Sequence, residues 1–293
     1  MFKKILFAGL IAIPFVGLAQ VKKDDFGWKY GGVGSIVFNQ ASFTNWAAGG
    51  ENNLMLTSLL SLNADFKDEK RVWENGLDLG YGKQRIQRDF FPARKSQDVI
   101  ELNSKYGRKI SPKTYASVNL NARTQFAKGY KFGDSTRTLV SDFLAPLFVT
   151  PSVGFDHKPF EGLSLYLSPL TGKFTYVGSQ FLADKGAFGV EPGGNFRSEL
   201  GASFNLKYKT TIMENVSFET KLQTFTNYST IDKVDVNWEN LISMKINEYL
   251  SANLITLLIY DEDIPVIVDE ETGRAGPRVQ FKEVFGVGLT YKF

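Results

Sequence analysis

The sequence lacks cysteine and contains a single histidine, His157. Without cysteine the chain can form no disulfide, no thiolate metal site and no lipid-anchoring cysteine. Zinc sites are built mostly from cysteine and histidine, so we expect no catalytic metal centre. The glycine-rich run 186–194 lacks the strand–loop–helix context of a phosphate-binding loop. The sequence therefore predicts neither a metal nor a cofactor.

An excess of one charge is also missing. The chain carries 34 Lys and Arg residues against 31 Asp and Glu residues, a net charge of +3, and both signs are spread along its length. Proteins that bind nucleic acid usually carry a basic stripe, and this sequence has none. We therefore expect no nucleic-acid partner.

Long apolar runs are confined to the N-terminus. The run 5–16 follows Lys3 and Lys4 and precedes small residues at the position that a signal peptidase needs. This pattern predicts a signal peptide at 1–19, followed by a short periplasmic lead at 20–27; the alternative is a buried N-terminal helix. The run is too short to cross a bilayer as a stop-transfer helix, and no later segment approaches that length. If the mature chain lies in a membrane, it crosses with strands.

Alternation of apolar and polar residues is what the sequence has in abundance. Extended stretches with this period follow one another along the mature chain, as in strands with one apolar and one polar face. We predict about twelve such strands, at 28–39, 52–66, 71–88, 96–110, 114–130, 146–157, 163–178, 196–211, 216–228, 234–247, 250–260 and 279–293. The stretch 250–260 is the least regular, because Ile255, Leu257 and Ile259 fall on the face expected to be polar.

The connections between these stretches alternate in length. Short links are predicted at 67–70, 111–113, 158–162, 212–215 and 248–249, and longer ones at 40–51, 89–95, 131–145, 179–195, 229–233 and 261–278. Short turns on one rim and long loops on the other are typical of outer-membrane barrels. Aromatic residues, 14% of the chain, lie mostly near strand ends, as in interfacial girdles. We predict an all-β protein, a transmembrane antiparallel up-and-down β-barrel over residues 28–293; a soluble β-sandwich or lipocalin-like barrel is the alternative.

The last strand carries the clearest alternation. Leu289, Tyr291 and Phe293 share one face with other apolar residues, and the pattern resembles the C-terminal signal of outer-membrane barrels. That resemblance implies recognition by the periplasmic barrel-assembly machinery. A closed barrel also requires the last strand to pair with the first, so we expect Ile36 and Phe38 to share the lipid-facing side with Leu289 and Tyr291.

A short motif follows the first predicted strand. It consists of Asn45, Trp46, Gly49, Gly50, Glu51 and Asn52. This N-W-A-x-G-G-E-N run resembles a family of uncharacterised outer-membrane β-barrel proteins from Bacteroidota, a domain-of-unknown-function family. The resemblance implies location and fold but no activity. Gly49 and Gly50 permit close backbone approach and Trp46 is a large apolar body, so the loop is predicted as a plug, a docking knob or a self-packed hairpin loop.

Charges of both signs fall on the predicted inner face of the strands. The lumen-lining candidates are Glu101, Lys105, Arg123, Arg197, Glu199, Lys207, Glu219, Lys221 and Glu239. One interpretation is a polar permeation path, and the other is a lumen closed by pairing of these charges.

These observations favour an integral protein of the cell outer membrane, in contact with outer-membrane lipid. We expect a narrow channel for small solutes; the alternative is a closed scaffold barrel whose long extracellular loops, led by 45–53, dock a protein partner. We expect no enzymatic activity, because His157 lies at a strand end on the short-turn rim, away from any loop-rim nucleophile.

Overall fold

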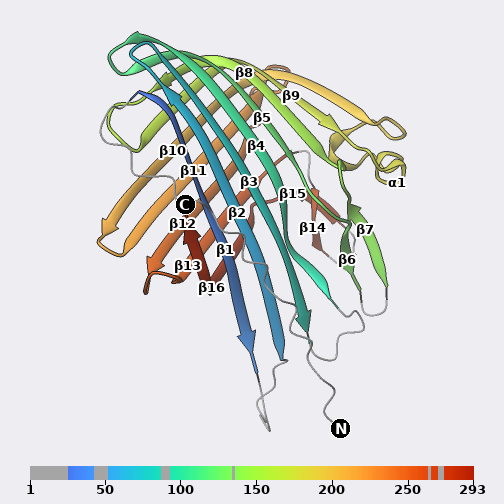
Figure 1. Ribbon diagram of the computed structural model, residues 1–293. Helices are drawn as coiled ribbons and strands as arrows, with labels where there is room; N and C mark the ends of the chain where they lie inside the picture. The colour runs from blue at the N-terminus through green and yellow to red at the C-terminus, as the bar shows by residue number, and fades with distance from the viewer. Residues whose placement is uncertain (1–25, 43–51, 87–92, 134–135, 263–264, 270–273) are drawn as a thin grey trace.

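A computed structural model describes residues 26–42, 52–86, 93–133, 136–262, 265–269 and 274–293. Twelve antiparallel strands form one closed barrel, in the ring order β1-β16-β13-β12-β11-β10-β9-β8-β5-β4-β3-β2 (Figure 1). The barrel strands are β1 (Gly27–Ala41), β2 (Asn53–Lys67), β3 (Arg71–Ile86), β4 (Arg94–Ser111), β5 (Thr114–Thr124), β8 (Leu147–His157), β9 (Leu163–Tyr176), β10 (Phe196–Met213), β11 (Val216–Asn227), β12 (Asp235–Lys245), β13 (Leu250–Tyr260) and β16 (Gln280–Lys292). This confirms the predicted fold class, and each predicted strand corresponds to one of the twelve.

The main departure from the predicted strands concerns 114–130, of which the barrel strand β5 uses only Thr114–Thr124. Side chains of the neighbouring strand β4 hold the next residues away from the ladder. The backbone N–H groups of Phe126 and Ala127 donate to the Asp98 carboxylate at 2.7 and 3.0 Å. Lys95 Nζ donates to the Ala127 carbonyl oxygen at 2.9 Å. These bonds replace the ladder bonds that a longer strand would have made.

The long loops contain structure of their own. They hold the hairpins β6 (Gly129–Phe132) with β7 (Arg137–Ser141) and β14 (Pro265–Asp269) with β15 (Arg274–Pro277), the short helix α1 (Gln180–Ala183) and the 3₁₀ turn η1 (Ala187–Gly189). Five residues of the segments around β8 to β10 form a small buried core, namely Ala145, Val177, Leu182, Ala183 and Val190. Within the described segments, no helix is long and apolar enough to cross a membrane.

The barrel closes where the first strand meets the last. β1 and β16 pair antiparallel from Val33–Lys292 to Phe38–Val287. Beyond the last ladder pair, the Gly32 N–H donates to the Phe293 carbonyl oxygen at 2.9 Å and the Phe293 N–H donates to the Gly32 carbonyl oxygen at 3.0 Å. A Cβ atom on Gly32 would lie 2.4 Å from Cζ of the Phe293 ring, so glycine leaves room for that ring.

The outer wall is apolar, as predicted. At the seam, Ile36, Phe38, Leu289 and Tyr291 are all exposed on the outer face. The same holds around the ring, where large exposed side chains alternate with inward ones; they include Leu54, Leu56, Leu102, Val118, Leu120, Val153, Phe155, Leu167, Leu200, Phe281, Phe285 and Val287. A continuous belt of exposed apolar side chains of this kind is unfavourable in water and suits lipid.

Aromatic side chains gather on the outer wall near the short-turn rim. The Trp28 ring lies 5.9 Å from that of Tyr30 and 5.5 Å from the rings of Phe66 and Trp73. Trp73 Nε1 donates to Ser104 Oγ at 2.9 Å, so its polar edge is satisfied while its ring faces outward. This cluster across β1, β2 and β3 has the character of an interfacial aromatic girdle.

Candidate functional site: the barrel lumen

Strand register places all nine lumen candidates on the inner face. Lys207, Lys221 and Glu239 are direct neighbours across β10, β11 and β12, and Glu101 pairs with Arg123 across β4 and β5. The remaining candidates occupy the same inner positions of their strands, namely Lys105, Arg197, Glu199 and Glu219. Since successive residues of a strand point to opposite faces, these charges project into the lumen while their apolar neighbours face outward.

An ion cluster lies near the short-turn rim. Lys105 Nζ lies 3.1 Å from Glu74 Oε2 and 2.7 Å from Asp156 Oδ2, and it also donates to Ser164 Oγ at 3.1 Å. Lys158, in the turn after β8, bonds to Glu74 as well and lies 3.5 Å from Asp156. Asp156 is fully buried, and the two nearby cations offset the cost of its desolvation. The cluster joins β3, β4, β8 and β9 on the inner side.

A second contact crosses the middle of the lumen. Lys221 Nζ on β11 lies 3.4 Å from Asp78 Oδ2 on β3, and these strands are six places apart in the ring of twelve. Ser61 on β2 donates to the same carboxylate, and Glu219 lies 3.6 Å from Lys221. Two side chains from diametrically opposite strands can meet only where the lumen is narrow. Their side chains remain 33% and 40% exposed, so space accessible to water persists around the contact.

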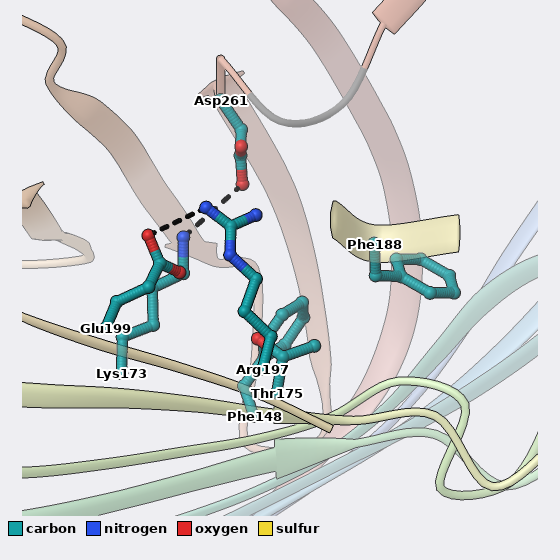
Figure 2. A pocket seen from close by; sticks show the side chains of 7 residues that line it. All are labelled: Phe148, Lys173, Thr175, Phe188, Arg197, Glu199 and Asp261. Atoms are coloured by element: carbon teal, nitrogen blue, oxygen red, sulfur yellow. Dashed lines mark hydrogen bonds and ion pairs between the residues drawn. The ribbon is translucent and has the colours of Figure 1, made fainter. Parts of the chain in front are cut away.

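A third set of charges lies near the long-loop rim (Figure 2). Lys173 Nζ on β9 lies 2.6 Å from Asp235 Oδ2 and 3.8 Å from Asp261 Oδ2. On β10, Arg197 donates to Glu199 Oε1 at 2.9 Å. The pocket here is lined by Phe148, Lys173, Thr175, Phe188, Arg197, Glu199 and Asp261. The neighbouring strands β8, β9 and β10, the residue that follows β13 and the turn η1 thus contribute to one mixed-charge pocket.

The two sides of the inner wall are packed differently. On β5, β8 and β9, and at Ser203 of β10, many inward side chains are small, polar and almost fully buried; they include Ser117, Asn119, Ser152, Ser168, Thr171 and Thr175. The inward side chains are half-buried on β11, on β12 from Asp235 to Ser243 and on β13 from Ile255 to Ile259. The accessible part of the lumen therefore borders β11, β12 and β13 and, on the opposite side, β2 and β3, where Ser61 and Asn63 are exposed and Asp78 is half-buried.

Beyond Asn253, toward the long-loop rim, the inner face of β13 is apolar. Ile255, Leu257 and Ile259 occupy inner positions, because they pair with Leu241, Glu239 and Asn237 of the β12 inner face. The expectation of a uniformly polar inner face does not hold on this strand. Lys282 of β16, the direct neighbour of Leu257, reaches β4, where it donates to the Ser96 carbonyl oxygen at 3.1 Å and to Gln97 Oε1.

Several residues of these clusters were not among the sequence-based candidates. Glu74, Asp156, Lys173 and Lys282 share the inward position of their strands with residues that were chosen. The same alternation would have found them if it had been applied to every charged residue of every strand.

Other predicted features lie elsewhere or outside the described residues. His157 ends β8 at the short-turn rim, where its Nδ1 lies 3.0 Å from Thr114 Oγ1. The predicted signal peptide falls outside the described residues, and so does the N-W-A-x-G-G-E-N loop except for Asn52. Among the described residues, no group of three or more metal-binding side chains is present.

Comparisons with known proteins give one family and several solved structures to which this chain is similar. A protein family described as "Protein of unknown function (DUF3078)" matches residues 38–130. No curated protein matches the chain. Among solved structures, the COG4313 outer membrane channel from Pseudomonas putida F1 is similar at 11% identity, with a TM-score of 0.42, covering 94% of this chain and 100% of that one. The translocator domain of the autotransporter NalP from Neisseria meningitidis is similar at 11% identity, with a TM-score of 0.37, covering 92% and 90%.

Proposed function

We propose that this protein is an integral outer-membrane barrel that conducts small solutes through a narrow lumen. The closed ring, the apolar outer wall and the aromatic cluster at one rim support a location in a membrane. The predicted signal peptide, which implies export, favours the outer membrane. The proposal involves lipid and the assembly machinery as partners, and no catalytic step.

The main support for a channel is the contact between Lys221 and Asp78. The Lys221–Asp78 contact spans the lumen between opposite strands, yet both side chains keep a large exposed fraction. A packed, closed interior would bury these side chains, and a wide pore would keep them apart. The arrangement is that of a constriction with water around it, held by an ion pair whose contribution is small because it is solvated.

The test is reconstitution in a planar lipid bilayer. The folded barrel, verified by heat-modifiable migration on mild-detergent gels, is expected to give small, reproducible conductance steps. A silent bilayer containing verified folded protein would contradict the channel and favour the scaffold. A mature chain that is fully soluble without detergent would overturn the membrane assignment itself.

A scaffold role is the second candidate, and the buried core beneath the long loops favours it. Leu182 and Ala183 of α1 pack with Val177 and Val190 at exposed fractions of 4% or less. A loop with its own core presents a fixed surface, as a docking platform for a protein partner would require.

Replacing Leu182 by Asn tests that loop core. Burying a polar side chain without a partner costs about 1–3 kcal/mol, enough to unfold a small local core while the barrel ladder stays intact. We expect limited proteolysis to cut within 177–195 much faster than in the wild type, with unchanged heat-modifiable migration. Phe181→Asn is the matched control, because Phe181 is 49% exposed on the same helix. Equal cleavage of both variants would show that the core does not order the loop.

A further inference from the structure

The accessible side of the lumen carries an apolar surface that a polar channel does not need. Five inward residues form it, and we call them the apolar strip: Leu241, Ile255, Leu257, Ile259 and Val284. Leu241, Ile255 and Val284 are direct neighbours in one row across β12, β13 and β16. All five are half-buried, so part of each side chain borders the lumen.

The packing of the rest of the lumen leaves the apolar strip beside the accessible space. Many inner side chains on β5, β8 and β9 are almost fully buried, so little space is left for a solute along that side. The open path borders β11, β12 and β13 on one side and β2 and β3 on the other. The strip lies along the first of these sides, from Ile259 near the long-loop rim to Leu241. Apolar surface that faces water inside a barrel is unfavourable unless something apolar covers it.

A cation stands beside the strip. Lys282 is the cross-strand neighbour of Leu257, and its two acceptors, the Ser96 carbonyl oxygen and Gln97 Oε1, are neutral. On the other side of Leu257 the neighbour is Glu239, which lies next to Lys221 in the same row. One row across the four strands therefore consists of Lys221 on β11, Glu239 on β12, Leu257 on β13 and Lys282 on β16. The apolar Leu257 lies between a carboxylate and a cation.

The narrowness of the lumen limits what can cover the strip. The Lys221–Asp78 contact bridges opposite strands, which leaves no room for a folded segment of another protein at that level. A narrow space of this kind suits a small solute. An apolar body would cover Leu257 and Ile255, while an anionic group would meet Lys282, whose protein acceptors carry no charge.

We propose that the apolar strip and Lys282 form a binding site for small amphipathic anions, solutes with an apolar body and one carboxylate or similar group. This inference rests on the proposed channel, because it names the class of solute that the lumen takes. It concerns binding inside the lumen, so it can be tested apart from conduction.

Two measurements separate the site from the channel. Binding of hexanoate to the protein in lipid nanodiscs is measured by calorimetry, with acetate and neutral hexanamide as probes. In planar bilayers, block of the ionic current by the same three probes is measured from the long-loop side. We expect hexanoate to bind and block at concentrations at least about tenfold lower than acetate does, because each buried CH₂ group favours association.

Substitutions assign the two parts of the site. Leu257→Asn is expected to weaken hexanoate binding about fivefold or more and to weaken hexanamide binding to a similar degree. Lys282→Gln is expected to weaken hexanoate about fivefold while leaving hexanamide nearly unchanged, because only the charged group is affected. Gln223→Asn, an inward polar position on β11 away from the strip, is the control and should change neither. Heat-modifiable migration verifies the fold of each variant.

The possible outcomes are distinct. Binding in nanodiscs together with a silent bilayer keeps the site and overturns the channel. Conductance with equal effects of hexanoate and acetate keeps the channel and overturns the site. Unchanged hexanoate affinity in both Leu257→Asn and Lys282→Gln would also overturn it.

Discussion

Lys221→Gln is expected to raise the conductance of the reconstituted barrel, because it removes the cationic half of the contact that bridges the lumen. A solvated ion pair contributes about 0.2–1 kcal/mol, so its loss should shift the constriction toward its wider arrangement by up to about fivefold. Lys221→Glu should have the larger effect, since it places a carboxylate opposite Asp78 and turns attraction into repulsion. It should also shift ion selectivity toward cations, and the reversal potential in asymmetric salt measures that shift.

Lys207→Gln is the matched control for this prediction. Lys207 is the cross-strand neighbour of Lys221 and also faces the lumen, but it lies in an exposed position with no contact across to Asp78. Its loss removes the same charge from the same row without opening the bridge. A conductance change as large as that of Lys221→Gln would show that total lumen charge, and not the bridge, sets the current. High salt should reduce the effect of both substitutions.

Deletion of Phe293 is expected to abolish assembly of the barrel in the membrane. The residue donates to and accepts from Gly32, and two backbone bonds at about 1 kcal/mol each are lost with it at the seam. The terminal pattern that resembles the assembly signal is lost as well. Fractionation followed by a heat-modifiability gel measures the result, and Phe293→Tyr, which keeps the ring and the backbone bonds, should assemble. Normal assembly of the deletion variant would contradict both roles.

Gly32 offers a way to disturb the seam without shortening the chain. A Cβ at this position would lie 2.4 and 2.6 Å from ring atoms of Phe293, so alanine must displace the ring. At Gly34, two residues along the same outer face, the nearest atom to a Cβ is Leu60 Cδ1 at 4.0 Å. Gly32→Ala is therefore expected to lower the temperature of heat modification, and Gly34→Ala should leave it unchanged.

The barrel was predictable because its strands are governed by a local rule. Alternation in 196–211 or 279–293 reflects a single requirement, one face in an apolar surrounding and one in a polar one, and each strand shows it independently. The end of β5 was not predictable in this way. Residues 125–127 leave the ladder because Asp98 and Lys95, about thirty residues earlier, bond to them, and periodicity carries no information about such contacts.

For the charged residues of the lumen, the sequence predicts that the side chains point inward, but it does not predict which residues they contact. Alternation indicates that Lys221 points inward, but its contact with Asp78, 143 residues away, depends on strand number, tilt and register together. The partners in the buried cluster around Asp156 could not be predicted from periodicity either, since Lys105 and Glu74 come from two other strands. The apolar face of β13 was visible in the sequence as an irregularity, and only the register shows that it borders the accessible path.

The seam has a kinetic consequence. Every other junction of the ring joins strands that are consecutive among the twelve, so each can zip up soon after its two strands are made. The seam alone joins the ends, as in the bond between the hydroxyls of Ser35 and Thr290, 255 residues apart. Closing so long a loop carries the largest entropic cost and favours late formation. Until then β1 and β16 both present open edges, and any strand that reaches them first competes with the native closure.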